Sequence, residues 1–204
     1  DEATDEAYLF MGGGVDGRDK ANPKTGRCMK LGDDMISISG NAVTLENPYL
    51  FEDSSLIKIG DTWYYSYCAN WNVPGGTNIN GVSFGNADIL YMTSKNPMGP
   101  WTSSQLSGMV FANTGSQRLD NGGNNHHSIV YFKGKYYVAY HARQTEIRLG
   151  VNGGKGFNYR STHIDECSFN NGKLSCSGSM AGVKQLEYLN PYQTVQAETM
   201  ANQG

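Results

Sequence analysis

The sequence predicts an all-β protein built from repeated units, in the manner of a β-propeller. Two stretches, residues 55–69 and 128–142, align without a gap at a constant spacing of 73 residues. Each consists of an apolar strand pattern, a turn around a glycine and an aromatic strand pattern, whereas helical periodicity is almost absent. Polar residues precede both copies, so reactive groups fall at the same place in each unit. Radial blades that point one end at a shared centre have this organisation.

Strand patterns follow one another along the whole chain, with turns rich in Gly, Asn and Pro between them. In chain order they cover Ala7–Gly14, two strands within 28–40 about Gly32, the hairpin of Leu56–Ile59 with Trp63–Cys68, Asp88–Ser94, the hairpin of Ser128–Phe132 with Tyr136–His141, and outer strands in 158–167 and 172–176.

The aromatic residues of these strands are predicted to form core between stacked sheets. Side chains alternate along Trp63–Cys68, so its odd-numbered and even-numbered residues face opposite sides. Both sides are largely apolar, as expected when sheets stack face to face. Trp101, which ends a turn rich in Pro and Gly, is expected to fill the space between two blades.

The composition limits the classes of partner. With 204 residues, the chain is long enough for one domain with a full core. A net charge of -3 and a charged fraction of 17% do not indicate a basic surface, so neither nucleic acid nor an anionic membrane is expected as partner. No apolar run approaches the roughly 18 residues needed to cross a bilayer.

The four cysteines allow one hairpin disulfide. Cys167 and Cys176 flank a turn and could face each other, while free or half-buried thiols are the alternative. The cysteine spacing fits no zinc pattern, which would need closely paired ligands.

The repeat also extends toward the start of the chain. Placing residues 5–13 beside 61–69 aligns Asp5 with Asp61 and puts the counterpart of Glu52 upstream of Asp1. The sequence therefore predicts three units, of which the first is incomplete. Because propellers have about four to eight blades, we expect N-terminal blades, from a missing segment or another polypeptide, to complete the ring.

Three segments together resemble glycoside hydrolase family 43. They are PYLFEDSSLIKIGDTWYYSYCANW from Pro48, GGNNHHSIVYFKGKYYVAYHARQ from Gly122, and YRSTHIDE from Tyr159. Their amino-acid sequences are most similar to those of arabinoxylan arabinofuranohydrolases and their xylan-active relatives. The tail NPYQTVQAETM resembles the start of a family 6 carbohydrate-binding module. The expected domains are therefore the C-terminal blades of a hydrolase, 1–188, and a linker with the first strand of that module, 189–204.

The resemblance implies a five-bladed β-propeller, of which this chain supplies about three blades, and an inverting mechanism. Inversion needs a protonated carboxyl beside the leaving oxygen and a carboxylate that activates water on the opposite face of the sugar. Glu52 matches the general acid by position. The family's base Asp and the Asp that orients the acid both fall upstream of Asp1. Asp53 is the rival of Glu52, although we expect it to bond backbone groups of the next turn.

His126 matches the family's axial histidine, which usually contacts a metal or water beneath the pocket, and calcium is the metal that the resemblance suggests. The repeat supports this match, because Asn125 and His126 occupy the positions of Glu52 and Asp53. His127 is the alternative for the axial role and also a candidate for substrate binding.

Four further residues are candidates for contacts with substrate, each with a packing or ion-pair role as the alternative. The indole of Trp71 could stack on a sugar face, and the other three candidates are polar: Asn70, Arg143 and Arg160. His141 and His163 are expected to be structural.

The sequence-based hypothesis is a secreted glycosidase that removes α-L-arabinofuranosyl side groups from arabinoxylan with inversion. A β-xylosidase, endo-xylanase or arabinanase on the same scaffold is the first alternative, because rim loops decide specificity. A non-catalytic carbohydrate-binding fragment is the second, because only one of three expected catalytic carboxylates lies within these residues.

Overall fold

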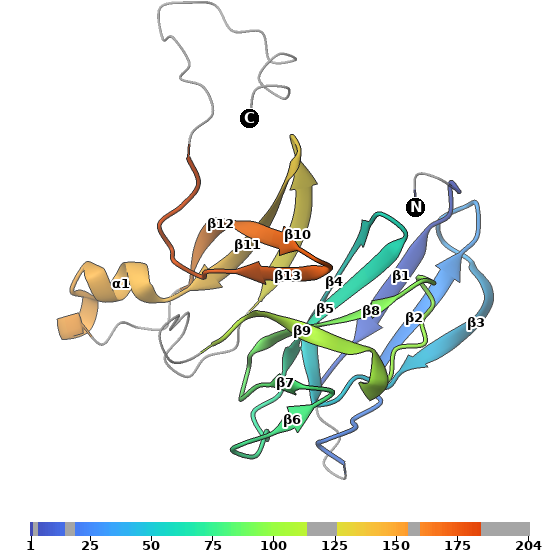
Figure 1. The fold of residues 1–204 in the computed structure, drawn as a ribbon, viewed down its shortest axis with the longest axis horizontal. Coiled ribbons are helices and arrows are strands. Elements are labelled where there is room, and N and C mark those ends of the chain that lie inside the picture. Colours follow the sequence, from blue (N-terminus) through green and yellow to red (C-terminus); the bar gives the residue numbers. More distant parts are fainter. Residues whose placement is uncertain (2–3, 15–18, 114–125, 155–159, 185–204) are drawn as a thin grey trace, which may run out of the picture.

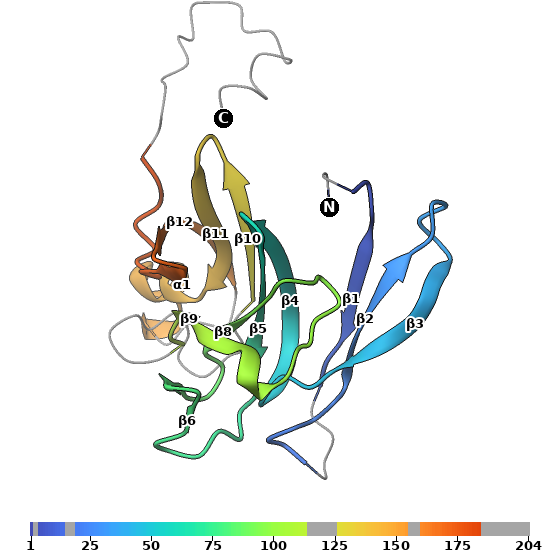
Figure 2. The same cartoon turned by 45° about the vertical axis from the view of Figure 1, so that its right-hand side comes forward.

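The computed structural model describes residues 1, 4–14, 19–113, 126–154 and 160–184. These form three main antiparallel sheets that stand side by side, and one short two-stranded sheet (Figures 1 and 2). The predicted all-β class is confirmed. The linker and module strand predicted for 189–204 lie outside the described residues.

The first sheet has three strands and the other two have four, as the repeat predicted. The first contains β1 (Tyr8–Gly12), β2 (Gly26–Leu31) and β3 (Ile38–Leu45) in that order. In the repeat, β1 aligns with the second strand of the next sheet. The described residues of the first sheet therefore include no counterpart of that next sheet's first strand, which carries Glu52.

The second and third sheets have the same meander order. The second sheet contains β4 (Leu50–Ile59), β5 (Thr62–Ala69), β8 (Ile89–Ser94) and β9 (Leu106–Phe111). The third contains β10 (His127–Phe132), β11 (Lys135–Ala142), β12 (Ser161–Asn170) and β13 (Lys173–Cys176). Both predicted hairpins are confirmed, as β4–β5 and β10–β11, and each strand is longer than its pattern indicated.

Several short elements connect these strands. The hairpin of β6 (Asn78–Ile79) and β7 (Val82–Ser83) lies between β5 and β8. The helical segments are η1 (Ser103–Gln105), α1 (Gln144–Arg148) and η2 (Val151–Gly154). None of the helices in the described ranges has the length and apolar character to cross a membrane.

One strand boundary was predicted wrongly, and one strand was not predicted at all. The second strand expected within 28–40 begins only at Ile38, because Asp34 Oδ1 accepts bonds from the backbone N–H groups of Ile36 and Ser37 and holds a wide turn. Strand β9 was not predicted, since its sequence, LSGMVF, mixes small and polar residues with apolar ones.

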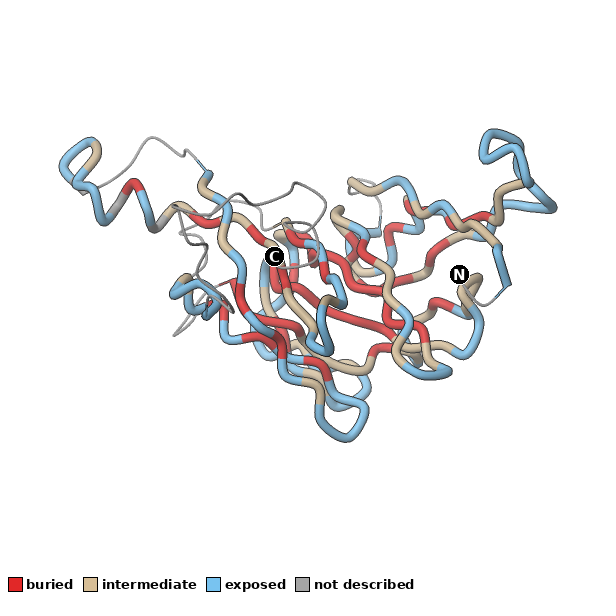
Figure 3. Tube along the Cα trace, turned by 90° about the horizontal axis from the view of Figure 1, so that it is seen from above, coloured by how far each residue is buried: buried red, intermediate tan, exposed pale blue. Residues whose placement is uncertain are grey.

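The core fills the two spaces between neighbouring sheets, and Figure 3 shows buried segments running through the middle of the molecule. Tyr65 and Tyr67 belong to the cluster between the first and second sheets, whereas Tyr64 and Cys68 belong to the cluster between the second and third. The predicted alternation along β5 is therefore confirmed. Trp101 packs edge-on against Phe10 of β1 and Tyr65 of β5, which confirms its predicted place between two units.

The outward faces of the first and third sheets expose several apolar side chains among polar ones. Leu9 and Met11 alternate with the inward-facing Phe10 and are 40% and 51% exposed. On the third sheet, Val130 and Ile164 are 45% and 44% exposed. Apolar side chains exposed on a sheet in this way are buried when a further sheet packs against them.

The predicted hairpin disulfide is present. Cys167 and Cys176 face each other in the register of β12 and β13 and are bonded. Cys28 and Cys68 are buried free thiols. Burial raises the pKa of the Cys28 thiol to about 11, so this thiol stays protonated at neutral pH.

Candidate active site

The starts of β4 and β10 lie together and bring the two predicted polar clusters into contact. His126 Nε2 lies 2.7 Å from Glu52 Oε1, and the backbone N–H of His127 donates to Asp53 Oδ2 at 2.7 Å. One step further along, the backbone N–H of Ile129 donates to Ser55 Oγ at 3.1 Å. The predicted convergence is confirmed for the described residues, although the contacting pairs are offset by one residue from the repeat-equivalent pairs. Asn125 lies outside the described residues.

Strand β4 is irregular where it carries the two carboxylates. Its pairing with β5 shifts register between Leu50 and Glu52 and again between Glu52 and Ser55. Asp53, between these shifts, has a φ of 71°, a left-handed backbone conformation that costs a non-glycine residue energy. Such a β-bulge re-aims a side chain relative to a regular strand.

Glu52 and His126 remain accessible to solvent. Their side chains are 29% and 41% exposed, so a ligand can reach the carboxyl group and the imidazole. A protonated carboxyl can donate to the imidazole, or a carboxylate can accept from it, and either arrangement fixes the rotamer of Glu52.

His127 is the buried counterpart of His126. Its side chain is fully buried, its Nδ1 is hydrogen-bonded to Asp53 Oδ2, and its Nε2 lies 2.6 Å from Ser66 Oγ. Because both ring nitrogens are engaged inside the protein, neither can reach a sugar. The substrate-binding role predicted for His127 is therefore corrected to a structural one. Asp53 bonds a backbone group, as expected, but that group is the N–H of His127 in β10 rather than one in the next turn.

The glycine-rich end of β1 packs against the backbone that carries Glu52. The backbone N–H of Gly14 donates to the Phe51 carbonyl at 2.5 Å. A Cβ atom added to Gly13 would lie 2.5 Å from the same oxygen and 3.3 Å from Glu52 Cα, and the φ of Gly13 is 144°. Only glycine fits here, both for the space and for the backbone conformation.

His141 adjoins this site, which the sequence did not indicate. Its Nε2 accepts a bond from the backbone N–H of His126 at 3.2 Å, and the two rings lie 5.3 Å apart. Burial, followed by the positive charge of Arg160, lowers the pKa of His141 to about 4, so its imidazole is neutral at neutral pH. In the repeat His141 aligns with Cys68, a core position, and the alignment therefore gave no signal of a role near the site.

The other predicted substrate contacts differ in accessibility. Arg160 is exposed and Arg143 half-buried, and the positive charge of each contributes to the lowered pKa of His141. Trp71 is half-buried and packs against the core cluster between the second and third sheets.

The substrate-binding prediction for Asn70 is corrected. Its side chain is fully buried, its Nδ2 donates to the Lys20 carbonyl at 2.8 Å, and its Oδ1 accepts from the backbone N–H of Asn72 at 2.9 Å. Each end of the amide is used to hold the loop after β5, because a buried amide must find internal partners.

The described residues do not by themselves make a calcium site. Calcium takes six to eight oxygen ligands, whereas His126 offers a nitrogen that already contacts Glu52. Across the described ranges, no group of three or more His, Cys, Asp or Glu side chains is arranged to hold a metal ion.

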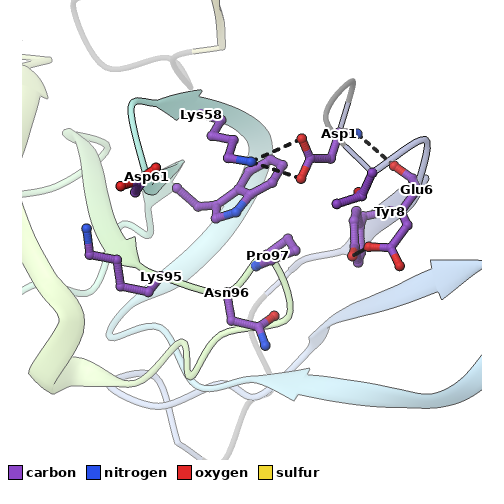
Figure 4. A pocket seen from close by; sticks show the side chains of 10 residues that line it. Asp1, Glu6, Tyr8, Lys58, Asp61, Lys95, Asn96 and Pro97 are labelled. Carbon is purple, nitrogen blue, oxygen red and sulfur yellow. Dashed lines mark hydrogen bonds and ion pairs between the residues drawn. The ribbon is translucent and has the colours of Figure 1, made fainter.

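A separate pocket of about 380 Å³ lies at the outer end of β4 (Figure 4). Lys58, in its wall, bonds both carboxylate oxygens of Asp1 at 3.1 and 3.0 Å and lies over the ring of Trp63. We call this the rim pocket; Glu52 is not among its lining residues, so it is distinct from the candidate active site.

Comparison with known proteins identifies the family. The family model described as glycosyl hydrolases family 43 matches residues 1–174. The chain belongs to glycoside hydrolase family 43. This family 43 chain is 44% identical to an arabinoxylan arabinofuranohydrolase of Paenibacillus polymyxa over 200 residues, covering 95% of the chain and 30% of the relative.

A second relative and a solved structure agree with this assignment. An arabinoxylan arabinofuranohydrolase of Bacillus subtilis is 44% identical over 205 residues, covering 97% of the chain and 38% of that protein. The crystal structure of a Bacillus subtilis family 43 arabinoxylan arabinofuranohydrolase in complex with cellotetraose matches with a TM-score of 0.76 and 41% identity, over 95% of this chain and 39% of that one. The chain thus spans about a third of the length of the curated relatives that it matches.

Proposed function

We propose that this chain carries the general-acid half of an inverting glycoside hydrolase that removes α-L-arabinofuranosyl groups from arabinoxylan. The observation that carries the proposal is the accessible carboxyl of Glu52, on a bulge at the start of β4 and 2.7 Å from His126. The two relatives named as arabinoxylan arabinofuranohydrolases, each 44% identical, support the substrate class.

In the proposed mechanism, Glu52 donates a proton to the oxygen that leaves with the xylan chain. His126 holds the rotamer of Glu52, so the carboxyl meets the leaving oxygen without a conformational search. The neutral His141 supports His126 through the bond that it accepts from the His126 backbone N–H. Arg143 and Arg160 are proposed to contact substrate, and Trp71 to border the sugar subsite.

The base that activates water, and the Asp that orients the acid, are proposed to come from blades outside these 204 residues. Exposed apolar side chains on the outward faces of the first and third sheets support further blades on either side, and the greater length of the relatives leaves room for the proposed five-bladed ring. We further propose that the protein is secreted, since its polymeric substrate lies outside the cell, and that residues 189–204 lead into a carbohydrate-binding module.

The test of the acid is Glu52→Gln in the complete protein, assayed on two substrates. Arabinofuranosyl xylo-oligosaccharides have poor leaving groups, whereas 4-nitrophenyl α-L-arabinofuranoside has a good one. The variant is expected to lose about 10²–10⁴-fold in kcat on the oligosaccharide and much less on the aryl glycoside, which needs little protonation. Equal losses on both substrates would remove Glu52 from the acid role.

The stereochemistry provides a second, independent test. Proton NMR of the first product should detect β-arabinofuranose before it mutarotates, as inversion requires. Release of xylo-oligosaccharides without arabinose would overturn the proposed specificity.

Calcium is a separate proposal that rests on the family resemblance, with His126 as one ligand and oxygen ligands from outside the described residues. Millimolar calcium should raise the Tm of the complete protein, and His126→Ala should abolish that rise. No step proposed for Glu52 depends on this metal.

A further inference from the structure

The residue after Glu52 bonds the second sheet to the third. Asp53 follows Glu52 on the bulge, and the Asp53 side chain points away from solvent with only 10% of its surface exposed. One carboxylate oxygen, Oδ2, accepts from both the backbone N–H and the ring Nδ1 of His127. The left-handed conformation of Asp53 persists because these two bonds hold it, since strained backbone survives only where its surroundings over-determine it.

The link continues into a third strand. Ser66 Oγ lies 2.6 Å from His127 Nε2 and 3.4 Å from the Ser55 carbonyl of β4. Ser66 pairs with Ser55 across β4 and β5, and Ser55 Oγ accepts from the backbone N–H of Ile129. Strands β4, β5 and β10 are therefore joined by one closed set of buried hydrogen bonds.

The order Ser66, His127, Asp53 has the connectivity of a Ser-His-Asp triad, but burial excludes nucleophilic chemistry. Ser66 is 1% exposed and the His127 side chain is fully buried, so no substrate can reach the hydroxyl. A catalytic nucleophile must be open to its substrate. The connectivity must therefore act on the structure around it.

We propose that Asp53, His127 and Ser66 are positioning residues that set the direction of the Glu52 carboxyl. Glu52 directly precedes Asp53, and His126 directly precedes His127. The bonds between Asp53 and His127 therefore fix the proposed acid and its hydrogen-bond partner together. Misplacing a reacting group by about 1 Å can cost about 10²-fold in rate. This inference rests on the proposed role of Glu52 as the acid.

Asp53→Ala in the complete protein removes both bonds to His127. We expect kcat on arabinofuranosyl xylo-oligosaccharides to fall by about 10²-fold, with KM nearly unchanged and a loss on the aryl glycoside of only a few-fold. Asp53→Asn keeps an oxygen for the His127 N–H groups and should recover part of the loss. Ser66→Ala, which removes the contacts of the Ser66 hydroxyl with His127 Nε2 and the Ser55 carbonyl, should cost about tenfold on the oligosaccharide.

Asp165→Ala is the matched control. Asp165 is a carboxylate 2% exposed on β12, and its Oδ2 accepts three bonds, from Ser177 Oγ, Ser179 Oγ and the Ser179 N–H. It is as buried and as well bonded as Asp53 but has no contact with Glu52 or His126. Its loss should lower Tm and leave the ratio of the two activities unchanged.

The inference is overturned if folded Asp53→Ala loses activity equally on both substrates, as a general loss of structure would produce. If Asp53→Ala does not fold, Asp53→Asn and Ser66→Ala decide by the same ratio. Glu52→Gln distinguishes failure of the positioning role from failure of the proposed acid role. A substrate-selective loss there, with none in the Asp53 and Ser66 variants, rejects the positioning role alone. No selective loss in Glu52→Gln rejects the acid itself.

Discussion

At each end of β4 a carboxylate joins the strand to another segment of the chain, yet the two ends differ in burial. At the inner end, Asp53 and His127 are 10% and 0% exposed and their bonds join the second sheet to the third. At the outer end, Lys58 and Asp1 meet in the rim pocket at 33% and 10% exposure. Both partners of the inner bond are closed to solvent, whereas Lys58 of the outer pair remains open to solvent and salt.

This difference follows from the cost of burying polar groups. Exposed ion pairs contribute about 0–1 kcal/mol, because water and salt screen them. A buried donor or acceptor left without its partner costs about 1–3 kcal/mol. The inner end therefore tolerates one geometry, which suits a strand that must aim the carboxyl we propose as the general acid. The outer end tolerates many.

The largest expected effect comes from crowding the inner end. In Gly13→Ala, the new Cβ would approach the Phe51 carbonyl to 2.5 Å and Glu52 Cα to 3.3 Å, so the backbone of Glu52 must move. We expect kcat on arabinofuranosyl xylo-oligosaccharides to fall by about 10²-fold, with a smaller loss on the aryl glycoside, measured in the complete protein.

Gly60→Ala changes the outer end of β4 and is the control for Gly13→Ala, which crowds the inner end of that strand. Gly60 also has a positive φ, 57°, but a Cβ there meets nothing within 4 Å. It should cost about 1 kcal/mol of stability through backbone strain and leave the activity ratio unchanged. If both glycine variants changed activity alike, the inner end would be no more sensitive than the outer.

The next effect is on stability. Ser66→Ala leaves His127 Nε2 without its partner and should destabilise by about 1–3 kcal/mol at any salt concentration. Lys58→Ala removes the bonds to Asp1 and should cost less than about 1 kcal/mol, a cost that disappears near 1 M salt. Thermal unfolding at low and high salt tests both. A salt-independent loss in Lys58→Ala would contradict the contrast between the two ends.

The fold was largely predictable because its periodicity is local. Alternation along β5 assigned Tyr64 and Tyr65 to opposite cores, and the glycine turns fixed both hairpins. Strand β9 was missed because its edge position, not its own sequence, makes LSGMVF a strand: β8 pairs with it and Leu106 is fully buried.

The site was predictable only to the level of which segments meet. The repeat brought Glu52 and His126 to one place, but it could not tell that His126 is exposed and His127 buried, since adjacent strand residues differ only by the face they occupy. The bulge at Asp53 decides those faces, and it depends on bonds to a strand far along the sequence. Asn70 was misjudged for the same reason, because its partner Lys20 is distant in sequence.

The smallest expected effect is a pH dependence at the outer end. Lys30, followed by Tyr8, bonds the Glu6 carboxylate and lowers its pKa from 4.5 to about 2. Because the folded state lowers this pKa, the stabilisation is present above about pH 4.5 and is lost as the pH falls toward 2. The Tm difference between wild type and Glu6→Gln should therefore shrink over this window. Glu6 lines the rim pocket and is solvent-exposed, so the difference should be small and should shrink further with salt. A difference that stayed constant from pH 6 to pH 2 would show that packing, rather than charge, holds Glu6, and the contrast between the ends of β4 would then rest on the inner end alone.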